Sequence, residues 1–318
     1  MTMPVPREAD WDLAPGLLEG AMDLELTAEQ CDLRYWLQAA VQGTLRGRPD
    51  GHDPRLTVGP HMLRGPFFDA IAQEYAFRSL AEEKATRVLS FLVANAPDVA
   101  SMEFYATQLL DECRHSMVFR NHLLALGVPA QRLTQAVQDF ADPYRTSVLE
   151  PLEQRCLEVM RDERDFIGGV VMMTVILEGA LAPAAELSER KWRPLDPAAA
   201  EIDKGAGIDE IRHLTVGAWI GREYLREHPG ERDRVVKMIR DGMRLWDELP
   251  THQMVYDREV RFQEGLELHR DIVGDYEIWP GRRLIDTTPK ERQDTADRWS
   301  DEMKTKRLVY MGLEEALR

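Results

Sequence analysis

Apolar residues recur at the spacing of an α-helix in almost every long segment of this chain. No run alternates apolar and polar residues as a half-buried strand would. A first helix is predicted from Thr27 to Arg46, because Thr27 and Gln30 form a capping-box pattern. The stretch 47–65 contains several prolines and glycines and is predicted to be a connecting loop.

Longer helices are predicted after this loop. They cover 66–94, then Asp98 or Ser101 to 126, then 149–192, then 196–227 with loosening at Gly205 and Gly207, then 231–270 with a kink at Pro250, and a last helix opened by Thr288 and Pro289. At least four of these helices are long enough for a bundle. We therefore expect an all-α fold in a single domain, 1–318, with a four-helix core at about 66–228. Helix 27–46 and the helices of 231–316 are expected to pack on that core.

Composition narrows the class of protein. Hydrophobic residues make up 44% and charged residues 30%, which is typical of a soluble globular protein. The net charge of −16 argues against nucleic-acid binding. Three scattered cysteines form no C-x-x-C pair, which argues against disulfides and a zinc ribbon and favours the cytoplasm; Cys113 is expected in the core. No membrane span is predicted, since the apolar stretch 166–177 runs into Glu178.

One five-residue pattern, D-E-x-R-H, occurs twice: at Asp111 to His115 and at Asp209 to His213. A single Glu-x-x-His is expected by chance in a chain with eight histidines, but the repeated five-residue pattern is not. Residues three apart lie on one helical face, so Glu112 and His115 can reach one metal ion together. Glu210 and His213 can reach a second ion in the same way.

A dimetal site in a bundle needs one further glutamate from each of two other helices. Glu82 precedes Glu112 by 30 residues and Glu178 precedes Glu210 by 32, about one helical hairpin in each case. Glu178 has apolar or small neighbours at every helical contact position, and an unpaired buried carboxylate is costly. Carboxylates with two imidazoles suit iron or manganese better than zinc. Less favoured ligand candidates are Glu83, Glu74, His122, Asp203 and Glu186.

The remaining motif residues suggest a supporting layer of hydrogen bonds. A metal-bound histidine usually donates its other ring N–H to a carboxylate, which fixes its orientation. An aspartate just before the ligand glutamate can reach the histidine of the facing helix. We therefore expect Asp111 to serve His213 and Asp209 to serve His115, each aspartate being held by Arg114 or Arg212.

The order Glu82, Glu112, His115, Glu178, Glu210, His213 resembles the ferritin-like di-iron carboxylate proteins. These include bacterial multicomponent monooxygenases, the small subunit of ribonucleotide reductase, acyl desaturases and arylamine N-oxygenases. The resemblance covers about 66–228. It implies a ferritin-like bundle with flanking helices, two iron ions, manganese being the alternative, and dioxygen as co-substrate.

Two departures narrow this resemblance. The radical-generating reductase subunit has a tyrosine seven residues after the first motif glutamate, where this chain has Phe119. Arylamine N-oxygenases carry an additional metal-binding histidine near the turn that reads Gly205-Ala206-Gly207 here. The layout is most similar to standalone di-iron oxygenases of bacterial secondary metabolism, of the type that forms valanimycin-like azoxy compounds.

The leading hypothesis is a di-iron oxygenase that forms a peroxo-diferric species and oxidises a small organic substrate, such as an amine or a hydrazine at nitrogen. Glu112 and Glu210 are the expected bridging ligands, with Glu82 and Glu178 terminal. The resemblance also implies a homodimer and an external electron donor. Residues expected to line the substrate pocket are Tyr105, Gln108, Phe119, Thr174 and Ala182.

Three alternatives remain open. The chain could be a ferroxidase or iron-handling protein without an organic substrate, a manganese or mixed-metal catalase or oxidase, or a helical scaffold with a degenerate site. An apolar cavity beside the metals would favour the oxygenase.

Overall fold

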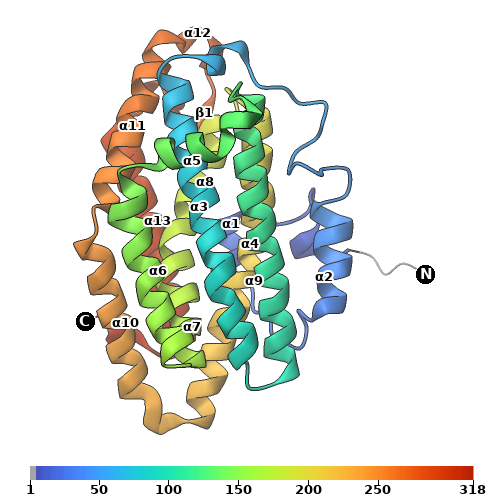
Figure 1. The fold of residues 1–318 in the computed structure, drawn as a ribbon, viewed down its shortest axis with the longest axis vertical. Helices are drawn as coiled ribbons and strands as arrows, with labels where there is room; N and C mark the ends of the chain where they lie inside the picture. The colour runs from blue at the N-terminus through green and yellow to red at the C-terminus, as the bar shows by residue number, and fades with distance from the viewer. Residues whose placement is uncertain (1–4, 318) are drawn as a thin grey trace.

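Helices make up nearly all of the regular structure in residues 5–317, the part of the chain that this computed structural model describes (Figure 1). Four long helical segments form the centre. They are α3 (Pro66–Asn95), α4 (Val99–Ala125), a segment made of α7 (Phe166–Val171), the π-helical stretch Met172–Leu177 and α8 (Glu178–Trp192), and α9 (Pro197–Glu227). α3 packs along α4 and α8 along α9, while α4 and α7 contact α9. The all-α bundle expected from the sequence is confirmed.

The helix boundaries follow from local chemistry. Pro66 opens α3 and α3 ends before Pro97, where a proline disfavours further helix. Asp98 caps α4 by accepting a hydrogen bond from the backbone N–H of Ser101 at 2.8 Å. Asp196 caps α9 in the same way. These boundaries confirm the sequence predictions, and Gly205 and Gly207 do not interrupt α9.

Shorter helices cover this centre. α10 and α11 lie along one side of the bundle, and α2 lies beside α4 on the other (Figure 1). The remaining helices and strands are α1 (Leu17–Asp23), α2 (Leu33–Ala39), α5 (Leu133–Ala141), α6 (Glu150–Leu157), α10 (Arg232–Glu248), α11 (Thr251–Leu268), α12 (Arg270–Val273), α13 (Pro289–Tyr310), β1 (Glu277–Trp279) and β2 (Arg282–Arg283). Further π-helical turns are Ala40–Thr44, Arg145–Leu149 and Glu158–Asp162; 3-10 turns are Arg7–Ala9, Pro60–Leu63, Ala130–Arg132, Pro229–Glu231, Leu284–Asp286 and Glu314–Leu317.

Several sequence predictions for the flanking segments are wrong in detail. Thr27 and Gln30 do exchange the two capping-box hydrogen bonds, at 3.2 and 3.3 Å, but they close only a turn. The helix begins at Leu33, capped by Asp32. The helix expected over 149–192 is broken after Asp162, where Arg164 has a φ of 53°. The helix expected over 231–270 is two helices that meet at Pro250.

Two further corrections concern small features. The strands β1 and β2 form an antiparallel hairpin that the sequence did not reveal, because three and two residues are too few to show alternation. Cys113 is exposed and does not belong to the core. It follows Glu112 on α4, so its side chain lies on a different face from the buried glutamate.

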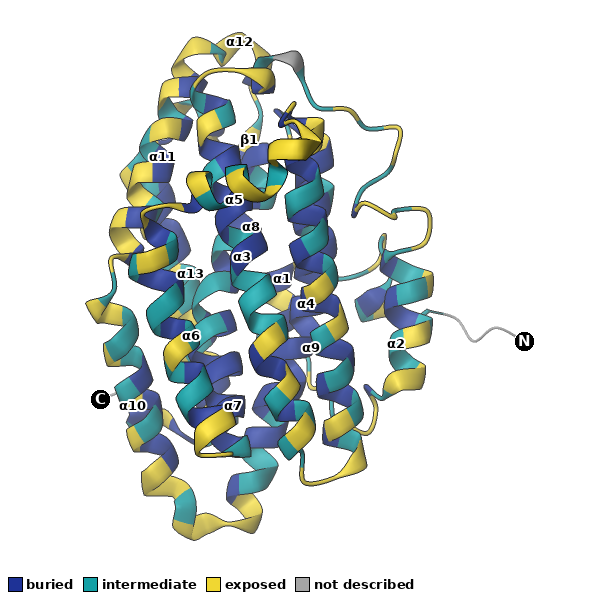
Figure 2. Ribbon diagram, in the orientation of Figure 1, coloured by how far each residue is buried: buried dark blue, intermediate teal, exposed yellow. Residues whose placement is uncertain are grey.

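The two largest apolar clusters occupy most of the interior, and a polar layer lies between them on every central helix. The first cluster takes Ile71 and Tyr75 from α3 and Phe119 from α4. The second takes Leu89 from α3 and Phe104 from α4. Along α7–α8 and along α9, too, the residues at one end belong to the first cluster and those at the other end to the second. Figure 2 shows this continuous buried interior. The motif residues therefore lie in the middle of the bundle, where both clusters shield them from water.

The segment Phe166–Trp192 is long and apolar enough to cross a bilayer, by length and composition only. Within the protein, however, 78% of its most apolar stretch is buried. It packs against α9 and α10 in the second apolar cluster. The stretch is therefore part of the helical core of the protein.

Candidate metal centre

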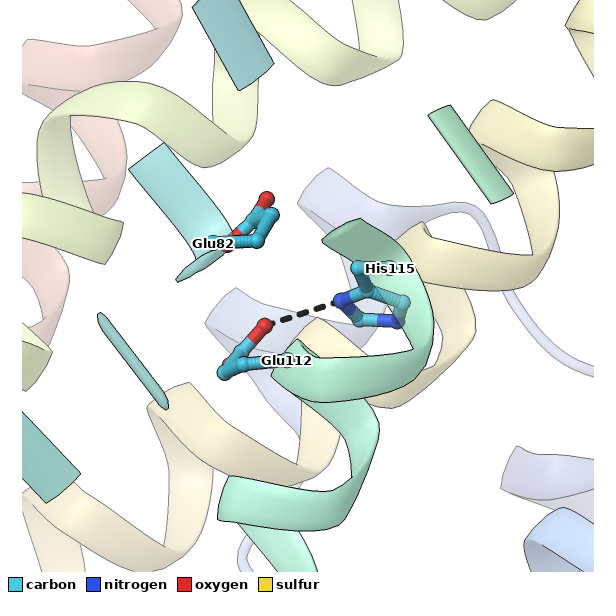
Figure 3. A group of neighbouring side chains, drawn as sticks. All are labelled: Glu82, Glu112 and His115. Carbon is cyan, nitrogen blue, oxygen red and sulfur yellow. Dashed lines mark hydrogen bonds and ion pairs between the residues drawn. The ribbon is translucent and has the colours of Figure 1, made fainter. Parts of the chain in front are cut away.

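The six ligands predicted from the sequence are brought together in the polar layer. Two groups of three have ligand atoms that all lie within 4.8 Å of one another: Glu82, Glu112 and His115 form one, and Glu112, Glu210 and His213 form the other. Figure 3 shows the first group, with Glu82 facing Glu112 and His115 across two helices. Glu112 belongs to both groups, so its carboxylate lies where a bridging ligand would.

Glu178 completes the arrangement from the fourth helical segment. Its Oε1 lies 4.0 Å from Nδ1 of His213. It is the first residue of α8, directly after the π-helical stretch Met172–Leu177. A π-helical turn adds a residue to the helix and is common at functional sites, since it re-aims the side chains that follow. Gln108 donates a hydrogen bond from Nε2 to Oε1 of Glu178 at 2.5 Å and holds the carboxylate in place.

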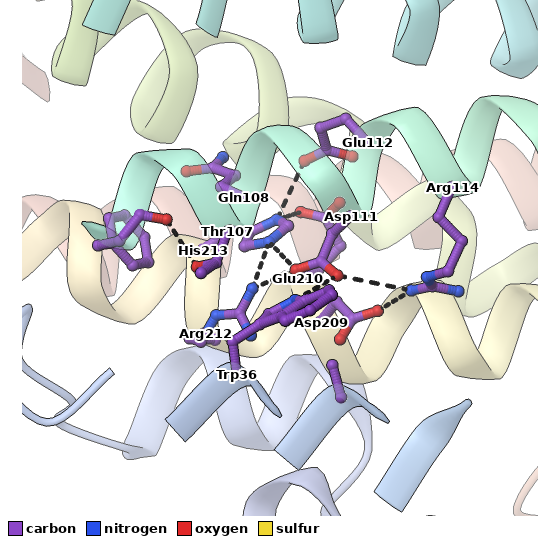
Figure 4. A network of polar contacts seen from close by, with 12 residues as sticks. Trp36, Thr107, Gln108, Asp111, Glu112, Arg114, Asp209, Glu210, Arg212 and His213 are labelled. Carbon is purple, nitrogen blue, oxygen red and sulfur yellow. Dashed lines mark hydrogen bonds and ion pairs between the residues drawn. The ribbon is translucent and has the colours of Figure 1, made fainter. Parts of the chain in front are cut away.

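Both imidazoles point the same ring nitrogen toward the carboxylates, as Figure 3 shows for His115 and Figure 4 for His213. Nδ1 of His115 lies 2.9 Å from Oε2 of Glu112, and Nδ1 of His213 lies 3.1 Å from Oε1 of the same residue. The opposite nitrogens, Nε2, each lie 3.3 Å from an aspartate of the facing helix: Asp209 for His115 and Asp111 for His213. Each ring is thereby oriented with Nδ1 toward the centre.

The aspartates are themselves held by the arginines of the motifs (Figure 4). Arg114 of α4 donates to Asp209 of α9, and Arg212 of α9 donates to Asp111 of α4. The sequence predicted that each aspartate would be held by one of these two arginines, and the structure shows that the arginine comes from the facing helix. Trp36 of α2 adds a hydrogen bond from its indole N–H to Oδ1 of Asp111 at 3.0 Å. No sequence pattern pointed to Trp36, because α2 joins the site only through tertiary packing.

The charge state of the cluster reflects its burial. Burial and the neighbouring charge of Glu112 raise the pKa of Glu82 well above its usual range. Burial and Glu210 do the same for the pKa of Glu178. Burial alone would raise the pKa of Glu112, but the two histidines outweigh it and lower that pKa. Burial and Arg114 oppose protonation of His115, yet hydrogen bonds to Asp209 and Glu112 raise its pKa to about 10. The raised pKa values mean that the buried carboxylates favour a bound positive charge, which either a proton or a metal cation can supply.

Unpaired polar atoms test whether metal ions fit these residues. Oε2 of Glu178 and Oε2 of Glu210 are buried and have no hydrogen-bond partner among the described residues. Buried polar atoms are nearly always paired, because an unpaired one costs about 1–3 kcal/mol. Both orphaned atoms are carboxylate oxygens of predicted ligands, and a bound cation would give each of them a partner. The donor set of oxygen and imidazole nitrogen fits iron or manganese.

A cavity of about 130 Å³ opens onto the carboxylate side of the cluster. Its lining includes Glu82, Glu112, Glu178 and Glu210, and is otherwise mostly apolar. The polar groups elsewhere in the lining are Arg78, Lys84, Glu153 and Arg258. None of these four was selected from the sequence, since each is spaced like an ordinary helix-face charge.

The five residues expected to line a substrate pocket are divided by the structure. Phe119 and Ala182 line this cavity, whereas the other three lie outside its lining. Gln108 is taken up by its bond to Glu178. Tyr105 packs edge-on against Phe104 and Phe166. Thr174 faces Gly217 of α9. Helical spacing placed these three near the metal ligands, but helix rotation turned them away from the cavity.

The less favoured ligand candidates have other partners. His122 pairs with Asp196 at 2.8 Å, and Asp203 pairs with Arg78 at 2.9 Å. Glu186 pairs with Arg190 on the next turn of α8. Glu74 is surrounded by basic side chains, and Glu83 is paired with Arg87 on the surface. Each of these acids is accounted for without a metal.

Comparison with known proteins establishes the fold. No family model and no curated protein matches this sequence. Among solved structures, a mutant of an R2-like ligand-binding oxidase with aerobically reconstituted Mn/Fe cofactor is similar, with a TM-score of 0.54 at 15% identity over 91% of this chain and 92% of that one. An R2-like ligand-binding oxidase with aerobically reconstituted metal cofactor after photoconversion gives the same score and identity, over 91% of each chain. The likeness supports the ferritin-like bundle.

Proposed function

We propose that this protein is a dimetal oxidoreductase that uses two ions, both iron or one manganese and one iron, to activate dioxygen and oxidise a small organic molecule. The observation that carries the proposal is Glu112, shared between two Glu–His groups beside an apolar cavity. The Mn/Fe cofactor named for one of the similar structures supports keeping manganese open. The six predicted ligands suit either metal.

In this proposal the six ligands hold the ions, which supply electrons to dioxygen and a place for it to bind. Glu112 and Glu210 are the bridging candidates, and Glu82 and Glu178 the terminal ones. Of these assignments, that of Glu112 has the most geometric support, because only Glu112 belongs to both groups.

The chain's own side chains keep the ligands in position. Asp111 and Asp209 accept the Nε2–H of the two histidines, which leaves each Nδ1 free to bind a metal. Arg212 lowers the pKa of Asp111 and so favours its ionised form, and Arg114 donates a hydrogen bond to Asp209. The two apolar clusters exclude water from the bundle on either side of the site. Phe119, which lines the cavity, has no hydroxyl, so a stored tyrosyl radical at this position is not part of the proposal.

The cavity favours an oxygenase over a ferroxidase. Iron handling requires no apolar chamber, whereas oxidation of an organic molecule requires one next to the ions. A cavity of about 130 Å³ suits a small molecule, since an engineered apolar cavity of about 150 Å³ holds benzene. N-oxidation of an amine or hydrazine, as in azoxy formation, is the finer form of the proposal and rests on the resemblance alone. An external electron donor and a homodimer are likewise part of the proposal.

The test is reconstitution followed by rapid mixing. The protein would be loaded anaerobically with ferrous iron, its metal content measured, and then mixed with dioxygen, with and without amines and hydrazines. We expect about two ions per chain and a transient visible absorbance whose decay is accelerated by one class of substrate. Featureless oxidation to ferric mineral, indifferent to every substrate, would instead support iron handling.

A further inference from the structure

A buried network of charged side chains joins the far part of the cavity to the core of the protein. Glu74 on α3 contacts Arg78 at 3.2 Å, Lys191 at 3.5 Å and Arg258 at 3.8 Å. Asp203 pairs with Arg78, and Glu259 pairs with Lys191 and Arg292. The network thus holds four basic side chains and three carboxylates. Within this network, the basic side chains therefore outnumber the carboxylates by one.

Arg258 of α11 is the side chain that carries this excess. Its side chain is 8% exposed, and its Nε and Nη2 are buried without a hydrogen-bond partner in the described part of the chain. Its nearest carboxylate, that of Glu74, is already held by Arg78, Lys191 and the hydroxyl of Ser188. A buried arginine without a hydrogen-bond acceptor is unusual, because desolvating a charge is costly unless a partner replaces water.

The free edge of Arg258 is the one that grips carboxylates. Its Nε and Nη2 are both unpaired. In this same protein Arg282 uses those two nitrogens to hold Glu291, at 2.7 and 2.6 Å, and Arg161 holds Asp162 likewise at 2.7 and 2.9 Å. The two N–H groups are parallel and match the two oxygens of a carboxylate. Arg258 also lines the cavity beside the metal candidates.

The contact between Arg258 and Glu74 shows how far Arg258 lies from the predicted metal ligands. Glu74, its neighbour, lies eight residues before Glu82 on the same helix, which is roughly 12 Å along the axis. Arg78 lies midway but is committed to Glu74 and Asp203. Lys84, also in the lining, is paired with Glu153. Of the three basic side chains in the lining, Arg258 is thus the one whose Nε and Nη2 have no hydrogen-bond acceptor among the described residues.

We propose that Arg258 binds the carboxylate of the organic substrate, and that the substrate is a small monocarboxylic acid whose apolar body fills the cavity and reaches toward the metal ligands. This inference deepens the proposed function and rests on it for identifying the bound acid as the substrate. A monoanion matches one uncompensated charge. A phosphate would bring about two charges to a single guanidinium. A cationic amine without an acid group would meet like charge.

The test is equilibrium binding of matched probes to the full-length protein, with and without metal, in the absence of dioxygen. Benzoate is compared with benzamide, and hexanoate with hexanamide, since each pair has the same shape and differs in charge. We expect the acid of at least one pair to bind at least about tenfold more tightly than its amide. Arg258→Gln should abolish that preference. Arg261→Gln, which removes an exposed arginine of the same helix, should keep it.

Two results would overturn the proposal: no preference for either acid in the wild-type protein, or a preference that survives Arg258→Gln. The wild-type comparison needs no variant to fold. Thermal melting adds a readout that a structural role would not give. Arg258→Met should not lower the melting temperature, whereas Arg292→Met should, because Arg292 donates to Glu259, Gln263 and Thr287.

The outcomes separate this inference from the proposed function. Acid binding that depends on Arg258, in a protein that takes up no metal, would leave the carboxylate subsite standing and defeat the dimetal function. Metal uptake and reaction with dioxygen without any preference for acids would support the dimetal function and defeat the carboxylate subsite.

Discussion

At the scale of single residues, neighbouring acids on α3 have opposite roles. Glu82 faces Glu112 and His115 in the interior, whereas Glu83 pairs with Arg87 at the surface. The two residues differ by about 100° around the helix axis. The carboxylate of Glu82 is in the interior and therefore needs a proton or a cation beside it. The carboxylate of Glu83 is at the surface, where water also solvates it.

This contrast gives a matched pair of variants. Glu82→Gln should reduce bound iron from about two ions per chain toward one, because each site in such a bundle depends on its terminal carboxylate. Glu83→Gln makes the same chemical change one residue along and should leave the metal content unaltered. Elemental analysis of both proteins after identical loading gives the measurement. Equal metal content in the two variants would remove Glu82 from the ligand set.

The aspartates of the two motifs act on the metals through the histidines. Asp111→Asn should weaken metal binding about 10- to 100-fold, since the hydrogen bond that orients His213 loses its charge. It would also leave Arg212 buried without its ionic partner. Competition with a chelator of known affinity measures the effect.

Trp36→Phe serves as the control for Asp111→Asn. It removes one neutral donor from Asp111 and leaves both Arg212 and His213 in place. Its effect should be smaller, about 1 kcal/mol or roughly fivefold. If the two variants weakened binding equally, the charge of Asp111 would not be the important property.

At the scale of elements, the π-helical stretch Met172–Leu177 and α9 approach one another closely. A β-carbon at Gly217 would lie 2.0 Å from Oγ1 and 3.0 Å from Cβ of Thr174. This contact lies one helical turn before Glu178. The glycine therefore permits the packing that brings the fourth carboxylate to the site.

Gly217→Ala should destabilise the protein by about 1–3 kcal/mol, because a β-branched side chain on a helix cannot move aside. Gly221→Ala, one turn along α9, meets only the terminal methyl of Met311 at 2.4 Å and should stay within about 1 kcal/mol of wild type. Chemical denaturation of both variants is the measurement. Thr174→Ala combined with Gly217→Ala should recover part of the loss.

At the scale of the whole molecule, four helical segments each contribute one part of a charged layer between two apolar clusters. Metal ions that bind only the folded chain stabilise it in proportion to their saturation. At a free metal concentration about a hundredfold above the dissociation constant, each site contributes about 2.7 kcal/mol. We therefore expect the melting temperature of the bundle to depend on how fully its metal sites are occupied.

Chelation should lower the melting temperature of the loaded protein, and refilling with ferrous iron under anaerobic conditions should restore it. The same cycle applied to Glu82→Gln should produce a smaller change. Differential scanning calorimetry at a fixed protein concentration measures both. A melting temperature independent of metal in the wild-type protein would contradict the proposed centre.

Features that depend on neighbours along the chain could be predicted from the sequence. The caps at Asp98 and Asp196 bind backbone groups three residues away, so their local patterns were sufficient to place the helix starts. The Glu-x-x-His spacing places both side chains on one helical face wherever that helix packs. The repeat of the pattern, and one preceding glutamate for each copy, selected the six side chains that the structure brings together; their binding of metal stays a prediction.

Features that depend on how the helices rotate and approach one another were decided only by the tertiary structure. Tyr105 and Thr174 have helical spacing compatible with the cavity, but the packing of α4 and of the π-helical stretch turns them elsewhere. Trp36 and Arg258 come from flanking helices whose place no local pattern encodes. Their contacts arise because burial brings together side chains that are far apart in the chain, and only the assembled fold shows that one guanidinium is left without an acceptor.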